Sequence, residues 1–246
     1  MKILGSFIIL AVLAGAGFAQ KPVVDGPSPV AVKTAEFAAE NELAKLAFQA
    51  HGGDKLRAMK TLVVRGSVDT TTSAFAQTLP GSFSMAISGA KYFIDMQNPV
   101  QSFKQTFDGA ETYSTLRGIT LPPVTSLGLP LLQKLCTTGY VVTSLPANSK
   151  KKRGFRMTAP DGVYTDFFVA EKTNQISGYE SSFTVNGNSI TTSAVIDKYR
   201  VVDGISVPEK YAQRFDLGQF TAYAEFKAKE IEINREVDDG VFSEQK

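Results

Sequence analysis

Apolar and polar residues alternate over long stretches of this chain, and this period of two limits the fold more than any other feature. Within residues 83–87 and 92–96, every second residue is large and apolar. Because successive side chains of a strand point to opposite faces, this alternation predicts strands with one apolar face. Turn-forming pairs separate many of the segments: Pro80-Gly81, Gly89-Ala90, Asp108-Gly109, Asp161-Gly162 and Asp203-Gly204. The chain therefore predicts about a dozen antiparallel strands at short spacing, as in a sandwich or barrel.

A helix is predicted before the first strand. Thr34 can cap its start, apolar residues recur at helical spacing, and Gly52-Gly53 end it. His51, the only histidine, lies at this helix end. We expect a structural role for it, with the protonated form favoured by the helix dipole, because no catalytic partner lies nearby in the sequence.

The segment from Ile119 to Leu135 breaks the alternation. It is strongly apolar, but Pro122, Pro123 and Pro130 exclude a central strand or a long helix. We expect a loop followed by a short helix over Leu129–Leu135. Two roles remain open for this segment: it packs on an ordinary core, or it covers a ligand cavity.

The N-terminal residues are typical of a secretory signal. Lys2 precedes an apolar run, and Gly17-Phe18-Ala19 supplies small residues before a cleavage point, so residues 1–19 are predicted to be a cleaved signal peptide. Residues 20–33 are rich in proline and predict a flexible linker. Residues 34–246 are then expected to form a single β domain.

Composition excludes several kinds of chemistry. One Cys and one His allow no intramolecular disulfide and give little basis for a zinc site. Cys136 is expected to be a small buried hydrophobe. Because it is far from the cleavage point, a lipid anchor is not expected, and the protein is predicted to be soluble in the periplasm or secreted.

Charge and motifs narrow the functions further. With 26 Lys+Arg against 24 Asp+Glu, the net charge of +2 gives no basic field for nucleic acid. Phosphate-binding loops and nucleophile elbows are absent from the sequence. The sequence therefore predicts no catalytic residue, no cofactor and no metal, and we expect a monomer that is not an enzyme.

One strongly basic run stands out, formed by Lys150, Lys151, Lys152 and Arg153. It lies between two predicted strands. Such a run is usually a solvated hairpin tip. The alternative is a docking site for an envelope partner protein or an anionic lipid surface.

Aromatic residues are abundant, with 17 Phe and 8 Tyr but no Trp. They could fill the core of a large β domain or line a cavity for an acyl chain. Since each buried methylene contributes about 0.8 kcal/mol, an apolar lining alone can hold a lipid. The candidates for a cavity lining are Phe83, Met85, Ile87, Tyr92, Ile94, Met96, Phe103, Phe107, Leu129, Leu132, Phe155, Met157, Phe167, Phe220 and Phe226.

Three stretches carry a resemblance to a known family: Asn41–Ala50 with Gly52-Gly53 and Leu56–Gly66; the D-G-x-x-x-P hairpin of Asp203–Tyr211; and Ile231–Asn234 followed by Asp238–Phe242. In this layout the chain resembles the LolA/LolB-like lipoprotein-carrier superfamily. The resemblance implies an exported, mainly β protein with a few helices (α+β), in which a curved antiparallel sheet forms a half-barrel. An N-terminal helix and a covering helical segment would shield its apolar concave side.

Three functional hypotheses follow. The first is a carrier or sensor that binds a lipid or lipoprotein acyl chain in a half-barrel. The second is a non-catalytic structural or interaction module of the cell envelope, whose own side chains fill the cavity. The third is a carboxylate-dependent hydrolase, which requires two acids converging in a polar cleft.

Overall fold

The computed structural model describes residues 36–243, apart from 74, 101, 116–119, 148, 150–151, 186–187 and 219. The predicted signal peptide (1–19), the linker (20–33) and Thr34, the predicted cap of the first helix, lie outside the described residues. The N-cap position of that helix is Phe37, so the prediction of Thr34 as its cap is wrong.

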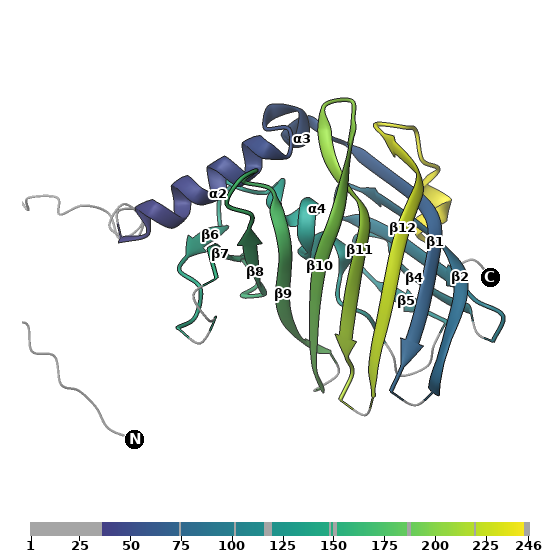
Figure 1. Cartoon of the computed structure of the whole chain (residues 1–246). Coiled ribbons are helices and arrows are strands. Elements are labelled where there is room, and N and C mark those ends of the chain that lie inside the picture. The colour runs from purple at the N-terminus through teal and green to yellow at the C-terminus, as the bar shows by residue number, and fades with distance from the viewer. Residues whose placement is uncertain are drawn as a thin grey trace, which may run out of the picture.

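The described chain forms one antiparallel sheet of 12 strands, in the order β5-β4-β3-β2-β1-β12-β11-β10-β9-β8-β7-β6 (Figure 1). No pairing among the described residues joins β5 to β6, so the sheet is open and curved. The strands are β1 (Thr61–Thr72), β2 (Phe75–Ser88), β3 (Lys91–Gln97), β4 (Ser102–Phe107), β5 (Thr112–Ser114), β6 (Val141–Thr143), β7 (Gly154–Thr158), β8 (Tyr164–Val169), β9 (Ile176–Val185), β10 (Asn188–Val202), β11 (Ile205–Asp216) and β12 (Thr221–Ile233). The predicted mainly β fold with a few helices is confirmed.

The path of the chain explains why something crosses the concave face. From β1 the strands run outward to one edge at β5, and from β6 they run back from the opposite edge to β12 in the middle. The connection from β5 to β6 must therefore cross the whole sheet. We call its described apolar part, residues 120–135, the cover segment.

The described residues form few helices. They are α2 (Ala38–Ala50), α3 (Asp54–Ala58), the 3-10 turn η1 (Val124–Ser126), α4 (Gly128–Leu132) and the 3-10 turn η2 (Asp239–Phe242). The helix predicted over Leu129–Leu135 thus begins one residue earlier and ends at Leu132. In Figure 1, α4 lies on the concave side of the sheet, and α2 extends from α3 toward β6 and β7.

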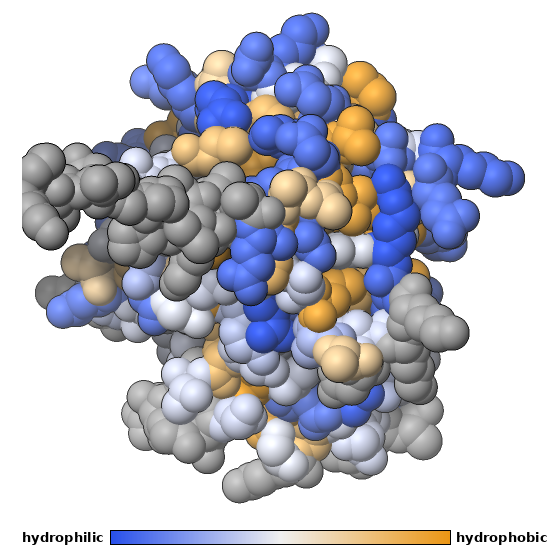
Figure 2. Space-filling model, turned by 90° about the vertical axis from the view of Figure 1, so that its left-hand side faces the viewer, coloured by the Kyte–Doolittle hydropathy of each residue, from blue (hydrophilic) through white to orange (hydrophobic). Residues whose placement is uncertain are grey.

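The face of α2 toward the core consists of two alanines and one phenylalanine. Ala44, Ala47 and Phe48 are its buried residues, and the helix packs against β6 and β7. Two alanines on this face permit a close approach of the helix to the strands. Viewed from this end of the molecule, hydrophilic residues cover much of the surface, with hydrophobic residues interspersed (Figure 2).

One predicted turn is wrong. Pro80-Gly81 lies within β2, where Pro80 pairs with Asp69 and Gly81 pairs with Val68 of β1. Proline is tolerated there because β3 pairs with β2 only as far as Ser82, so Pro80 has a partner strand on one side only. The strand therefore passes through a pair that usually signals a turn.

Most of the core lies on the concave side, and a smaller cluster lies on the convex side. Leu132, Phe155 and Phe167 of the main core are completely buried. The convex cluster joins Phe242 of η2 to Val63 and Ala86, so the C-terminal segment folds back over β1 and β2. The sheet is consequently covered on both faces near its middle strands.

Candidate functional site

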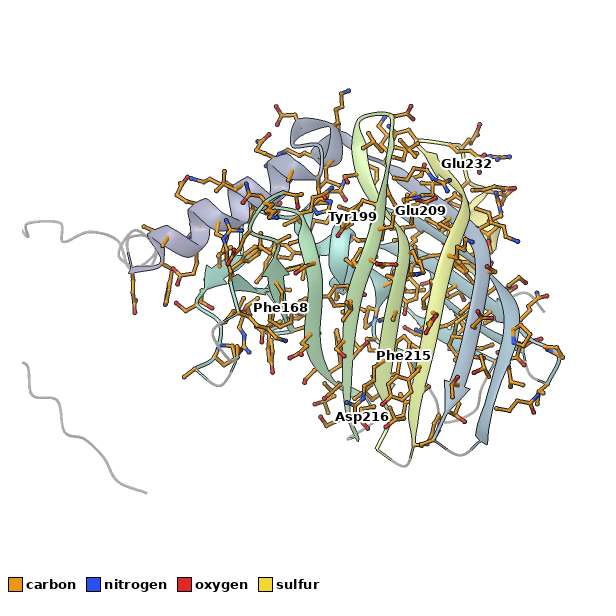
Figure 3. All side chains as sticks on the ribbon, in the orientation of Figure 1. Phe168, Tyr199, Glu209, Phe215, Asp216 and Glu232 are labelled. Atoms are coloured by element: carbon orange, nitrogen blue, oxygen red, sulfur yellow. The ribbon has the colours of Figure 1, made fainter. Side chains whose placement is uncertain are left out.

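A covered cavity of about 100 Å³ lies between the concave face of the sheet and the cover segment. The sheet contributes its floor: Leu62, Val64, Met85, Ile94, Ile176, Tyr179, Ile196, Tyr199, Val207, Pro208, Tyr211, Gln213, Phe215 and Phe226. The cover segment contributes its roof: Leu121, Pro122, Val124, Leu127, Gly128, Leu129 and Pro130. Figure 3 shows Tyr199 toward the α3 end of β10 and Phe215 toward the other end of β11.

The beginning of the cover segment is held by a buried amide. Gln105 of β4 accepts a hydrogen bond from the Leu121 N–H at 2.7 Å and donates to the Leu121 carbonyl oxygen at 2.9 Å. The same Nε2 atom donates to the Tyr92 hydroxyl at 2.8 Å. Both backbone groups of Leu121 are therefore satisfied by one side chain, as a buried irregular segment requires.

The other end of the cover segment is tied to α3. Gln133 Nε2 donates to the carbonyl oxygens of Leu56 at 3.0 Å and Met59 at 2.6 Å. In return, the Arg57 guanidinium donates to the Leu135 carbonyl oxygen at 3.1 Å. Gln133 thus binds carbonyl groups at the end of α3, one of which, that of Leu56, also accepts from the Met59 N–H, so the short helix and the cover segment stabilise each other.

His51 joins α2 to the sheet. Its Nδ1 lies 2.9 Å from the Ser206 carbonyl oxygen, and its Nε2 accepts a hydrogen bond from the Ile176 N–H at 3.0 Å. This pairing assigns the proton of the neutral ring to Nδ1. Burial lowers the pKa of His51, so the protonated state expected from the helix dipole is wrong. With both nitrogens occupied, the ring acts as a structural link.

A bulge in β10 shapes the floor of the cavity. The register of β10 against β11 shifts between Ile196 and Tyr199. In a regular strand, residues three apart face opposite sides, but here Ile196 and Tyr199 both line the cavity. Tyr199 then donates a hydrogen bond to the Ile176 carbonyl oxygen at 2.5 Å. The bulge therefore adds a tyrosine to the concave face that simple alternation would place outside.

The lining is neutral. Among the described residues around the cavity there is no Asp, Glu, Lys or Arg. Burial raises the pKa values of Tyr179, Tyr199 and Tyr211, so these phenols stay protonated. The cavity thus suits apolar groups and uncharged polar groups.

The predicted lining residues divide into two sets. Met85, Ile94, Leu129 and Phe226 line the cavity. The others are not among the residues that line it: Phe83, Ile87, Tyr92, Phe103, Leu132, Phe155, Met157 and Phe167 are buried, and Met96, Phe107 and Phe220 are partly buried. Phe83 lies on the same face of β2 as Met85 and packs edge-on against Phe226 with ring centroids 5.0 Å apart.

Sequence reasoning missed the polar lining residues. Tyr211, Gln213 and Phe215 share one face of β11, so the period-two pattern could have grouped them. The period-two pattern could not identify Tyr199, because the bulge in β10 interrupts the alternation. His51 was recognised as structural, but its position in the cavity wall depends on contacts with Ile176 and Ser206 that are distant in the sequence.

The predicted docking residues are described only in part. Lys150 and Lys151 lie outside the described residues. Lys152 lies 3.6 Å from a carboxylate oxygen of Glu180 and 3.9 Å from the ring centroid of Phe168. Arg153 donates hydrogen bonds to the Ala170 carbonyl oxygen at 3.1 Å and to Asn174 Oδ1 at 2.8 Å. Both described side chains thus have partners within the chain.

Cys136 differs from its prediction. It is exposed, directly after the last turn of the cover segment, with a φ of 64°. The tight turn that follows Leu135 directs the chain back toward β6 and places this residue at the surface. The expectation of a buried cysteine is therefore wrong.

No helix in the described part of the chain has both the length and the apolar character needed to cross a membrane.

Comparison with solved structures finds similar proteins. A LolA superfamily protein from Nitrosomonas europaea superposes with a TM-score of 0.51 at 10% identity, covering 83% of this chain and 97% of that chain. A DUF1329 family protein from Desulfovibrio piger gives a TM-score of 0.47 at 8% identity, covering 85% and 97% respectively. A putative outer membrane lipoprotein-sorting protein domain from Vibrio parahaemolyticus gives 0.41 at 9% identity, covering 81% and 97%.

These similarities concern the fold. Comparison with protein-family models finds no matching family. Comparison with curated proteins finds no match. At 10% identity, the similarity shows that this chain has a LolA-like curved sheet, as the sequence resemblance implied.

Proposed function

We propose that this protein is an exported, non-catalytic carrier or sensor that binds a lipid or lipoprotein acyl chain in the covered cavity. The observation that carries the proposal is the cavity itself, which is mainly apolar, uncharged and bounded by the concave face and the cover segment. Residues 1–19 would direct export to the periplasm or the exterior, residues 20–33 would link, and residues 34–246 would act as one monomeric β domain.

The size of the cavity bears on how a ligand would enter. Small-molecule sites usually enclose about 300–1,000 Å³, whereas this cavity encloses about 100 Å³. A long acyl chain therefore requires the cover segment to move away from the sheet. Three contacts hold the cover segment in place, at Gln105, at Thr165, whose hydroxyl donates to the Ser126 carbonyl oxygen, and at α3.

The same small volume favours a second candidate. A structural or interaction module of the cell envelope would keep the cover segment closed and the cavity filled by its own side chains. The hydrolase hypothesis receives no support, because no carboxylate is among the described residues that line the cavity.

The experiment is a direct search for bound lipid. The protein beginning at Gln20 is purified from an exporting host, extracted with organic solvent and analysed by mass spectrometry, and its melting temperature is measured with added acyl ligands. Co-purified lipid or a ligand-dependent rise in melting temperature supports the carrier. Finding neither would leave the structural module as the better account.

A matched pair of variants makes the test specific to the cavity. Val64→Phe places a larger side chain in the cavity floor and should reduce ligand binding. Val195→Phe makes the same change on the exposed face of β10 and should bind as the parent does. Equal binding by both variants would place the ligand elsewhere on the protein.

A further inference from the structure

Two tyrosine hydroxyls in the cavity have no hydrogen-bond partner among the described residues. Tyr179 is only 8% exposed, and its hydroxyl neither donates nor accepts a hydrogen bond within that part of the chain. Tyr211 is partly buried, and its hydroxyl also has no hydrogen bond to the described residues. By contrast, Tyr199 and Tyr92 each have a partner, in the Ile176 carbonyl oxygen and in Gln105. Among the described residues, the fully buried side-chain oxygens that lack a partner are Thr72 Oγ1 and Thr106 Oγ1, so the two tyrosine hydroxyls keep some accessible surface. Because both tyrosines line the cavity, these hydroxyls are available to a ligand there.

Strand register brings these hydroxyl-bearing residues to one part of the floor. Ala194 of β10 pairs with Tyr179 of β9 on one side and with Gln213 of β11 on the other. Tyr211 lies two residues before Gln213, on the same face of β11, and pairs with Ile196. Since adjacent strands lie about 4.8 Å apart, the backbones of Tyr179 and Gln213 are about 10 Å apart across the small Ala194.

The surrounding rings fix where the tyrosines lie. The Tyr211 ring stacks on Phe226, with centroids 4.7 Å apart and an interplanar angle of 16°. The Tyr179 ring packs edge-on against Phe167, and a Cβ placed on Gly128 of the cover segment would lie 3.3 Å from it. Tyr179 is thus held between the core and the roof, and both rings are positioned before any ligand arrives.

The chemistry of this region is uncharged. Burial raises the pKa values of Tyr179 and Tyr211, so both hydroxyls remain neutral donors. Gln213 donates through Nε2 to Thr192 Oγ1 at 2.9 Å, so this N–H is used within the sheet and the two tyrosine hydroxyls are the donors available to a ligand. No described cation lines the cavity to pair with an anion, and an unpaired buried charge is strongly unfavourable. The site therefore favours an uncharged group that accepts hydrogen bonds.

We propose that Tyr179 and Tyr211, beside Gln213, form a neutral polar site that binds the carbonyl group of an acyl ester and selects it over a free fatty-acid anion and over plain hydrocarbon. The inference rests on the proposed function, because the site lies in the same cavity. The ester carbonyl would accept hydrogen bonds from the tyrosine hydroxyls while the acyl chain occupies the apolar remainder.

Three ligands of equal chain length test the selectivity. Methyl palmitate, palmitate at pH 8 and hexadecane are titrated against the protein by displacement of an apolar fluorescent dye. We expect the ester to bind about tenfold tighter than either of the others, because only the ester is both uncharged and a hydrogen-bond acceptor. Equal binding of hexadecane and the ester, or tightest binding of palmitate, would overturn this inference but leave the acyl carrier standing.

Hydroxyl deletion tests the residues. Tyr179→Phe and Tyr211→Phe should each weaken ester binding about threefold to tenfold, while hexadecane binding stays equal or improves. Tyr223→Phe, at a tyrosine that is 48% exposed, is the matched control and should change neither. Unchanged ester affinity in both cavity variants would overturn the assignment.

The unfolding temperature of each variant without ligand shows whether the deleted hydroxyl contributes to the fold. Because the deleted hydroxyls have no partner, Tyr179→Phe and Tyr211→Phe should unfold at or above the temperature of the parent protein. A clear loss of stability in both would mean that the hydroxyls serve the fold, which contradicts the inference. If none of the three ligands displaces the dye from the parent protein, the proposed function fails and this inference fails with it.

Discussion

The Nε2 atom of His51, at the end of α2, accepts a hydrogen bond from the backbone N–H of Ile176, on β9, at 3.0 Å. A protonated ring would present a second N–H at this position instead of an acceptor. The contact between the helix and the sheet therefore exists only with a neutral imidazole.

Acid should weaken the fold through this contact. The pKa of His51 is lowered by burial, whereas an unfolded His titrates near about 6.5. Above that pH His51 is neutral in both the folded and the unfolded chain, and its contact contributes fully to the free energy of unfolding. Below it the unfolded chain binds a proton that the folded chain resists, so the free energy of unfolding falls by up to about 1.4 kcal/mol per pH unit.

The measurement is urea unfolding at several pH values between 5 and 7.5. His51 is the only histidine, so His51→Gln should remove the part of the pH dependence that begins near neutrality. Parallel pH profiles for the variant and the parent would show that His51 does not cause the effect.

Removing the amide of Gln105 should release the start of the cover segment. Gln105→Leu leaves the N–H and carbonyl groups of Leu121 without their partner, which costs about 2–4 kcal/mol of unfolding free energy. Hydrogen exchange over residues 120–132 should accelerate, because the local bonds are lost. Gln97→Leu, at an exposed amide that donates to Asp95, is the control. Equal exchange rates in the two variants would contradict the role of Gln105.

The C-terminal segment should contribute strongly to stability. Phe242 is completely buried against Val63 and Ala86, so Phe242→Ala should lower the free energy of unfolding by about 3–5 kcal/mol. The exposed neighbour Ser243 provides the comparison through Ser243→Ala, which should have little effect. A loss below about 1 kcal/mol for Phe242→Ala would mean that this segment does not pack as described.

Cys136 should react in the folded state. Its side chain is exposed, so a thiol reagent should label one cysteine per chain without denaturant. Cys136→Ser should abolish the labelling. Reaction only after unfolding would show that the residue is buried in solution.

Local sequence patterns predicted much of the fold. Alternation identified nearly every strand, because a sheet with one buried face imposes a period of two on its sequence. Pro80-Gly81 was misinterpreted as a turn, since nothing local shows that β3 stops pairing at Ser82. Cys136 was placed inside for a similar reason: the apolar run before it gave no sign of the tight turn that exposes it.

The site was harder to predict from the sequence than the fold was. Met85 and Ile94 were identified as lining residues by their strand faces alone. Tyr199 required knowledge of a bulge, and the partnerless state of Tyr179 required knowledge of every neighbour. Such features depend on which strands meet in three dimensions, and a period within one segment does not contain that information.

The central ladder of the sheet pairs its first strand with its last. Leu62 lies opposite Ile233, and Thr72 lies opposite Ala222, so β1 has no partner on that side until β12 is present. Each half of the sheet consists of hairpins between neighbours in the chain and can begin to pair early. The cavity floor, however, spans both halves and is complete only after the final strand is in place. A chain that ends before residue 221 should therefore yield two separate half-sheets with no enclosed interior, and only the full-length chain should acquire one.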